Sequence, residues 1–386
     1  MPIIDSVRVF ETIDPIADEW DQLADRVRAT PFVRPGWMQA WLDAFGGERL
    51  RTYTVWREDQ LVGLIPMLAR GSGLFSLANL ETPSFAPLAE DAESSCRLIE
   101  ALLAEQPRRM DFGYLATEVP ASVHLVNVLR QRSYRHLRQR ALRSPYTNVD
   151  IAWDVFQKRL SRNRRKGLRR RQRHLADTGV LRFAVHDGRE HLDDLLAEGF
   201  AVEASGWKGR QGTAIARNAN LHRFYVAVAR WAADRGWLRL YFLRLDDRAI
   251  AFELALHHNG VLYDLKGGYD EQYSQWSPSL LLLAEMVQAA CTDDTRVIEW
   301  LGDDEPFKLE WSDGIRERVS STWLVPSIRG LVDYLRLTLW WELRRQSKAR
   351  LPRSLIKDIR TATGRVRQMR GARRQDCEAV GRSSIP

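Results

Sequence analysis

One order of predicted elements occurs twice in this chain: a strand, two helices and then a β-hairpin. The first copy runs from VRVF to the hairpin RTYTVWREDQLVGLIPMLA, and the second from LRFAVHD to the hairpin LRLYFLRLDDRAIAFELALHH. Both hairpins join two strand-like runs through a short acidic turn. A repeat of this kind predicts two copies of one α/β unit in tandem.

The second copy continues further than the first. Its hairpin is followed by a third strand, VLYDLKGGY, the polar loop DEQYSQ, a helix from about Pro278 to Ala290 and a strand at RVIEWL. The first copy has no comparable step from loop to helix, and its stretch SLANLETPSFAPLAED follows no regular period. If only one lobe keeps a working cleft, this difference favours the second.

The patterns divide the chain into four segments. These are a degenerate N-terminal lobe (1–150), a basic connecting helix (151–179), a catalytic lobe (180–326) and a basic helical tail, partly disordered (327–386). The connecting helix holds 10 Lys and Arg between Lys158 and Arg173. Like charges at this density repel one another, which favours an anionic partner over a solvated face or nonspecific nucleic-acid contact.

Charge is distributed unevenly along the chain. Residues 326–386 contain 15 Lys and Arg against 5 Asp and Glu, whereas residues 1–325 contain 43 against 45. The net charge of +8 therefore comes from the tail and does not indicate that the whole protein binds nucleic acid. The three cysteines have no CxxC spacing, and no segment offers the ~20 apolar residues of a membrane span. We therefore expect a cytoplasmic protein.

The tail combines apolar and basic residues. Its stretch RGLVDYLRLTLWWELRRQSKAR places Leu331, Leu335 and Trp340 beside arginines. One interpretation is a helix lying on an anionic membrane surface, which would make the protein peripheral at the inner membrane. The other is a helix docked on the body of the protein.

Four motifs occur in order along residues 5–326. They are PFVRPGWMQAWLDAFGG with LVGLIPM, then SRNRRKGLRRRQRHL, then EASGWKGRQGT, and finally KGGYDEQYSQWSPSLLLL with IEWLGDDEPFKLEW. Together they resemble the CelD/BioF-like branch of the GNAT superfamily, a tandem group related to the FemAB aminoacyl transferases. The resemblance implies a mixed, mostly antiparallel sheet in each lobe, splayed at its middle to admit an acyl thioester or, in the Fem branch, an aminoacyl ester. It also implies direct attack of an acceptor amine or hydroxyl on the activated carbonyl.

The loop that would hold coenzyme A departs from the usual GNAT pattern. Such loops usually read Arg/Gln-x-x-Gly-x-Gly/Ala before a helix, whereas the stretch from Gln275 to Ser279 contains no glycine. With Pro278 near N1 and Ser277 as N-cap, the helix can still present its amides and its dipole. We assign donor binding to Ser277, Ser279 and Leu280 and expect no tightly bound cofactor. Acyl-CoA, an acyl-carrier protein and an aminoacyl-tRNA remain possible donors.

Two charged groups of the second lobe are candidates for chemistry. Glu203 is predicted to assist deprotonation of the acceptor, and Trp207 and Lys208 to contact it. Asp264 and Lys266 alternate on the strand VLYDLKGGY, so we expect them on one face, bordering a cleft. The structural alternatives are a helix end with a packing tryptophan and a structural ion pair.

The loop and turn after that strand supply the remaining candidates. Tyr269 is predicted to protonate the leaving thiolate and Tyr273 to contact substrate, although loop aromatics can also serve packing alone. Resemblance to the family pattern G-x-x-x-[YF]-K, which has one residue more here between Gly302 and Phe307, implies that Lys308 faces the cleft, close to Asp303, and a surface lysine is the alternative. The histidines lack paired metal spacing, so we predict no metal site and an exposed pair at 257–258.

These observations predict an acyltransferase. It would move an acyl group from a thioester donor to an amine or hydroxyl of a small-molecule or glycan-type acceptor, related to the envelope or to polysaccharides. Nucleic acid is not expected as a partner, except tRNA in the first alternative, a Fem-like aminoacyl-tRNA-dependent transferase. The second alternative is a non-catalytic, membrane-associated scaffold that kept the fold. No Gly-x-Ser-x-Gly elbow or Walker loop supports a hydrolase or an NTPase.

Overall fold

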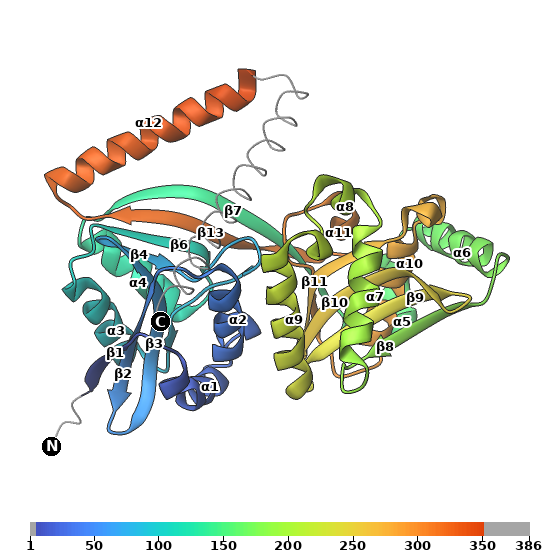
Figure 1. The fold of residues 1–386 in the computed structure, drawn as a ribbon, viewed down its shortest axis with the longest axis horizontal. Helices are drawn as coiled ribbons and strands as arrows, with labels where there is room; N and C mark the ends of the chain where they lie inside the picture. The colour runs from blue at the N-terminus through green and yellow to red at the C-terminus, as the bar shows by residue number, and fades with distance from the viewer. Residues whose placement is uncertain (1–4, 351–386) are drawn as a thin grey trace, which may run out of the picture. The chain divides into compact units, whose positions relative to one another are not determined.

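The computed structural model describes residues 5–350, and for Arg140, Trp207 and residues 344–350 the backbone alone is described. The described chain divides into two units, one of residues 5–330 and one that begins at Leu331. No helix within residues 5–350 is both long and apolar enough to cross a membrane. The first unit holds all the elements that carry the predicted site (Figure 1).

The first lobe follows the predicted order of strand, two helices and hairpin. Its strands are β1 (Ser6–Phe10), β2 (Arg49–Arg57), β3 (Gln60–Arg70), β4 (Gly73–Ser76), β5 (Leu88–Ala89), β6 (Arg109–Ala116) and β7 (Arg135–Asn148). Its helices are η1 (Asp14–Ile16), α1 (Ala17–Arg26), η2 (Pro31–Val33), α2 (Pro35–Phe45), α3 (Ala92–Ala104) and α4 (Pro120–Gln131).

The second lobe repeats this order. Its strands are β8 (Leu181–His186), β9 (Leu238–Leu245), β10 (Arg248–His258), β11 (Val261–Tyr269), β12 (Val297–Glu299) and β13 (Gly314–Leu324). Its helices are α7 (Leu192–Ala204), α8 (Trp207–Gln211), η3 (Ile215–Arg217), α9 (Ala219–Asp234), η4 (Glu271–Trp276), α10 (Pro278–Ala290) and α11 (Pro306–Leu309).

The strands of both lobes form one 13-stranded, mostly antiparallel sheet, in the order β1-β2-β3-β4-β6-β13-β7-β12-β11-β10-β9-β8, with β5 beside β3. The predicted mixed α/β class is confirmed, but the lobes do not have separate sheets. The reason is an exchange: β13 of the second lobe inserts between β6 and β7, and β7 of the first lobe pairs with β12. A single sheet therefore crosses both lobes (Figure 1).

The basic connector consists of two helices, α5 (Trp153–Arg159) and α6 (Arg162–Ala176), where one was predicted. The chain bends at Leu160, whose side chain is buried, and the Ser161 side chain caps α6 by accepting a hydrogen bond from the Arg164 amide at 3.1 Å. A serine in this position starts a new helix because it satisfies an amide that the first turn leaves unpaired. The charged run is therefore presented by α6 and the end of α5.

Apolar residues of β10 pack on both faces of the sheet, which fixes the layers of the second lobe. Phe252 and Leu254 belong to the core shared with α7 and α9, whereas Ala251 and Ala255 belong to the core shared with α10. Successive side chains of a strand point to opposite faces of the sheet. A strand whose odd and even positions are both apolar therefore has other elements packed on both of its faces. Figure 1 shows α7 and α10 flanking these strands.

The second unit begins within α12 (Ile328–Arg350), which matches the predicted tail helix as far as residue 350. Large apolar side chains on this helix are exposed, among them Leu335, Leu339 and Trp340. The rest of the predicted tail lies outside the described residues, and both interpretations of it remain predictions.

Candidate functional site

A cavity of about 550 Å³ opens where β11 and β12 separate. These two strands run parallel and pair over three residues only, Val261–Tyr263 with Val297–Glu299. Beyond that point the end of β11, the N-terminal end of α10 and the turn before α11 line the cavity. The resemblance implied a sheet splayed at its middle, and the second lobe has such an opening between β11 and β12.

The first lobe has a corresponding pair of parallel strands, β4 and β6, but its own chain closes the gap. Phe85 is buried and bridges β6 beyond the end of β4: its amide donates to the Tyr114 carbonyl and its carbonyl accepts from the Ala116 amide. Next to it, β5 pairs with β3. The same segment contributes Leu80, Glu81 and Pro83 to the cavity of the second lobe. The segment SLANLETPSFAPLAED, which follows no regular period, thus closes the gap between β4 and β6 in the first lobe and lines the cavity of the second.

A β-bulge separates the two charged residues of β11. Leu254 pairs with Lys266 and Ala255 pairs with Asp264, so Leu265 is an extra residue without a partner across the ladder. Paired residues share a face, which places Asp264 on the α10 face and Lys266 on the α7 face. The prediction that Asp264 and Lys266 share a face was therefore wrong, although both line the cavity.

Asp264 forms a carboxyl pair with Glu253 of β10, which is buried. Burial raises the pKa of Glu253 well above its ordinary range, and the adjacent Asp264 carboxylate adds to this. Burial also raises the pKa of Asp264, to about 6, against the attraction of Lys308 and Lys208 for its charged form. The shared proton therefore resides on Glu253. Within the described residues, Asp264 Oδ1 is buried without a hydrogen-bond partner.

Two glycines of β11 make room for this arrangement. A Cβ at Gly267 would lie 1.4 Å from Glu253 Oε2, and one at Gly268 would lie 2.7 Å from the Glu203 Cα of α7. Neither distance is compatible with a side chain unless its neighbour moves. The GG pair of the KGGY motif thus lets the Glu253 carboxyl and the α7 backbone approach β11 closely.

Glu203 and Lys208 form an ion pair at the end of α7. Glu203 is buried, and its Oε2 accepts a hydrogen bond from the Ile215 amide at 2.9 Å. Lys208 Nζ lies 3.4 Å from Glu203 Oε1 and donates to the Gly267 carbonyl at 2.6 Å. Both residues line the cavity as predicted, but these bonds tie Glu203 to its neighbours and favour a positioning role for it.

Lys266 meets a residue from the first lobe. Its Nζ lies 3.0 Å from Glu81 Oε2, and the same oxygen accepts a hydrogen bond from the Tyr225 hydroxyl at 2.6 Å. Burial raises the pKa of Tyr225 well above its ordinary range, so the hydroxyl stays protonated. This cluster is a polar wall of the cavity, and it is built from both lobes.

Lys308 lies in α11 and lines the cavity, with a mostly buried side chain. Its Nζ donates to the Leu301 carbonyl at 3.1 Å and lies 2.9 Å from Glu305 Oε2. Gly302, at a φ of +61°, allows the turn that brings Lys308 back over the strand end. The interpretation of Lys308 as a surface lysine is thus not supported.

The N-terminal end of α10 forms the opposite edge of the cavity. Ser277, Ser279 and Leu280 all line it, as predicted for donor-binding residues. Ser277 occupies the N-cap position in a left-handed conformation, with a φ of +50°, but its side chain makes no capping hydrogen bond. The predicted capping role of its hydroxyl is therefore wrong, and the hydroxyl stays available to the cavity.

The other predicted residues differ in their placement. Tyr269 lines the cavity and packs against the core under α10. Tyr273 is not among the cavity-lining residues, and its ring packs against Trp276 at 6.0 Å. Asp303 also lies outside the lining and accepts a hydrogen bond from the Arg143 amide. Trp207 begins α8, and its side chain lies outside the described residues.

Among the cavity residues that escaped prediction are Glu81, Tyr225 and Glu253. Glu253 interrupts the apolar run AFELAL, and a lone acid in a buried strand is a signal that could have identified it. Tyr225 lies among the apolar residues of α9 and carries no such signal. Glu81 reaches the cavity only through contact between the lobes, which no local pattern encodes.

The two adjacent histidines are buried, not exposed as predicted. His258 lies at the contact of the lobes, with its Nε2 3.3 Å from Arg34 Nη2 and its ring against Trp237. Burial lowers the pKa of His258 to about 4, and the Arg34 guanidinium adds to this. The His257 side chain is directed to the opposite face, as expected for the next residue of a strand.

The cavity lies in a splayed sheet, with the Asp264 carboxyl and the N-terminal end of α10 among the groups that line or border it. Residues 162–309, less than half of the chain, match the family model described as acetyltransferase (GNAT) domain. The match confirms the predicted resemblance to the CelD/BioF-like branch of the GNAT superfamily, and a domain of this kind implies acyl transfer as the type of reaction.

Solved structures support the fold. One match is the C-terminal domain (DUF2156) of a putative lysylphosphatidylglycerol synthetase from Agrobacterium fabrum, at 11% identity and a TM-score of 0.51, covering 82% of this chain and 94% of that one. FemX matches at 11% identity and a TM-score of 0.52, covering 78% and 95%. A conserved protein of unknown function from Bacteroides thetaiotaomicron matches at 11% identity and a TM-score of 0.53, covering 83% and 100%. No curated protein matched the sequence.

Proposed function

We propose that this protein transfers an acyl group from a thioester donor to an amine or hydroxyl of an acceptor related to the envelope or to polysaccharides. The observation that carries the proposal is the cavity between β11 and β12, which is lined by Asp264, Lys308 and the N-terminal end of α10; within the described residues, Oδ1 of Asp264 has no hydrogen-bond partner. A base, a cation and a helix N-terminus around one space are what direct acyl transfer requires.

Asp264 acts as the general base. The acceptor nitrogen or oxygen forms a bond to the thioester carbonyl carbon while its proton passes to Asp264 Oδ1. The carbon–sulfur bond then breaks, and the leaving thiolate takes up a proton, for which the Tyr269 hydroxyl is the proposed donor. The protonated Glu253 orients Asp264, and Lys308 offsets negative charge that develops at the carbonyl oxygen.

The donor enters at the α10 end of the cavity, along Ser277 and Ser279. Apolar residues continue inward from there, and they provide a surface for an acyl chain; these are Leu265, Leu280, Leu283, Trp300, Leu301 and Phe307. The loop without glycine presents a proline at N1, so few amides are free to hold a pyrophosphate. This favours contact with the pantetheine arm and the acyl chain over a tight phosphate cradle.

A basic groove supports a donor with a large anionic carrier. Six cationic residues of α5 and α6 line it, and none is ion-paired within the described residues; these are Lys158, Arg162, Arg165, Lys166, Arg169 and Arg173. The helix α6 packs against η4 and α10, which border the donor end of the cavity. An acyl-carrier protein whose acidic surface occupies this groove would bring its thioester to the entrance.

Thermal unfolding with added donors tests the proposal. Acetyl-CoA and a long-chain acyl-CoA are added separately to the full chain at increasing concentration. Saturable stabilisation by the long-chain thioester, lost in a Leu283→Glu variant, is the expected result. Arg217→Glu, on the surface of η3, is the matched charge control and should keep the wild-type response. The absence of stabilisation by either thioester, and by an acyl-carrier thioester, would contradict the proposal.

The basic groove and the fold shared with FemX also favour a second candidate, an aminoacyl-tRNA-dependent transferase. In that case the cavity would receive an aminoacyl ester, and the groove would contact RNA phosphates. Binding of aminoacylated but not of free tRNA, with thioesters giving no stabilisation, would select this candidate. The two functions share the cavity and differ in the carrier.

A further inference from the structure

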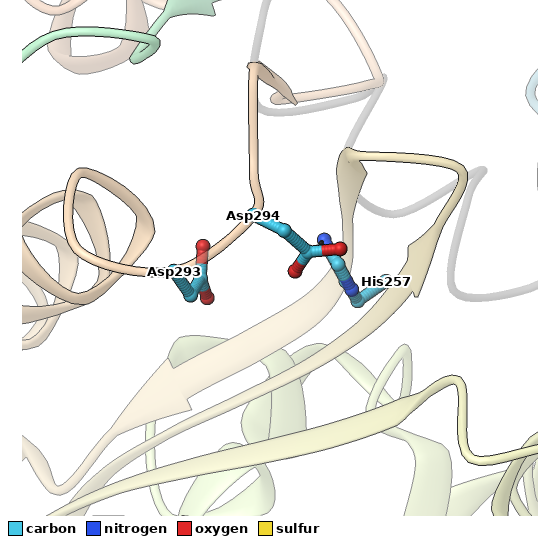
Figure 2. Close-up of side chains that lie close together, drawn as sticks. All are labelled: His257, Asp293 and Asp294. Carbon is cyan, nitrogen blue, oxygen red and sulfur yellow. Dashed lines mark ion pairs between the residues drawn. The ribbon is translucent and has the colours of Figure 1, made fainter.

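A second cluster of polar residues lies away from the cavity. His257 is near the end of β10, and Asp293 and Asp294 follow the last turn of α10 (Figure 2). One potential ligand atom from each residue lies within 4.8 Å of the others. None of the three lines the cavity, and α10, at 13 residues, places about 20 Å between this cluster and the donor end.

His257 points to a ligand independently of the two acids. Its side chain is only 10% exposed, yet its Nε2 is buried without a hydrogen-bond partner within the described residues. An imidazole nitrogen in this position costs free energy unless something binds it. The nearest acid oxygen, Oδ1 of Asp294, is 3.5 Å away, too far for a good hydrogen bond.

The two carboxylates beside His257 attract a cation, and the imidazole offers a nitrogen lone pair to a metal ion. The nearby guanidinium of Arg239 donates to the carbonyls of Gly236 and Leu238.

The two carboxylates can complete a coordination shell. Asp293 accepts a hydrogen bond from the Thr295 amide at 2.8 Å through Oδ1, which orients the side chain and leaves Oδ2 to bind. Asp294 is 82% exposed, so an ion can enter from solvent and keep water as its remaining ligands. One nitrogen and two oxygens suit a divalent transition metal better than Mg²⁺ or Ca²⁺, which favour oxygen alone.

We propose that His257, Asp293 and Asp294 form a binding site for a divalent transition-metal ion of the Zn²⁺ or Co²⁺ type. The sequence predicted no such site, because the ligands lack local spacing and meet only when the end of β10 packs beside the end of α10. A bound ion would join these two ends and hold α10 in place. Its role is structural, since the cluster is remote from Asp264.

Titration of the metal-free full chain with Co²⁺ and Zn²⁺ tests the site. We expect one equivalent to bind, with a Co²⁺ absorption band and a higher unfolding temperature. The surface variant D293N/D294N should raise the dissociation constant at least about tenfold, and His257→Gln should do the same. Circular dichroism without metal checks that both variants fold.

The matched control is D246N/D247N, which changes the adjacent aspartates of the β9–β10 turn; among the described residues, these two belong to no cluster of potential metal ligands. It should bind Co²⁺ as the wild type does. Equal weakening in both double variants would mean that any exposed acidic pair attracts the ion, and would overturn the proposal. Binding of neither ion by the wild-type chain would overturn it as well.

Discussion

Replacing Asp264 with Asn should stabilise the protein and abolish most of its activity. Burial raises the pKa of this carboxyl from 3.8 to about 6, so the folded state disfavours its ionised form. A shift of roughly two pKa units corresponds to about 3 kcal/mol of folding free energy. Asn cannot ionise, and its side-chain carbonyl oxygen can still accept a hydrogen bond from the protonated Glu253.

The sign and the pH range follow from proton linkage. Because the folded pKa is raised, the folded state binds the proton more tightly than the unfolded state, and stability falls as the pH rises from about 4 to about 6. Above pH 6 the carboxyl is ionised in both states, and the full destabilisation of the folded state is present. The Asn variant should therefore gain up to about 3 kcal/mol at pH 8 and about 1 kcal/mol at pH 4.5.

Urea unfolding of both proteins at these two pH values measures the effect. Asp270→Asn is the control of opposite sign, because Asp270 is buried and pairs with Arg248 at 2.6 Å, so its loss should destabilise. In the transfer assay, loss of a general base should lower kcat by about 10²- to 10⁴-fold. A variant that is less stable at pH 8, or equally stabilised at both pH values, would refute the reasoning.

Three further variants test the packing around the site. Arg34→Met should lower the free energy of unfolding by about 3 kcal/mol, because it removes a buried guanidinium that pairs with Asp25 and contacts His258 Nε2, whereas Asp21 keeps Arg235 as a partner. Urea unfolding against an Arg28→Met surface control would show it, and an unchanged midpoint would count against it. Gly268→Ala should cost about 1–3 kcal/mol and weaken donor-induced stabilisation, because its Cβ would lie 2.7 Å from the Glu203 Cα, whereas Gly47→Ala, with open space around it, should change neither. Removal of residues 331–386 should leave donor-induced stabilisation intact, because the cavity lies wholly within residues 1–330; its loss would favour the scaffold alternative.

The order of elements and the location of the cleft could be predicted because both depend on local signals. The apolar periods define the strands and helices, and the step from β11 through a polar loop to α10 is unique to the second copy. Lys308 was predicted through the resemblance to a short family pattern, which is also local in sequence. These features need only residues that are close in sequence.

The rest depends on contacts between distant segments. Alternation placed Asp264 and Lys266 on one face, but the extra residue Leu265 shifts the register, and a bulge leaves no reliable trace in composition. Local patterns predict that β7 and β13 are strands, but they do not predict which strands these two pair with, so the exchange between the lobes could not be foreseen. Glu81 enters the cavity from the other lobe for the same reason.

The central claim is that the space between β11 and β12 receives the activated acyl group beside Asp264. A crystal structure with a thioether analogue of an acyl-pantetheine, the part common to acyl-CoA and an acyl-carrier donor, tests it most directly. The account predicts the sulfur and the acyl carbons in the cavity, with the reacting position within hydrogen-bond reach of Lys308 and near Asp264 Oδ1. An analogue bound outside the cavity, with Asp264 closed off by protein side chains, would contradict it.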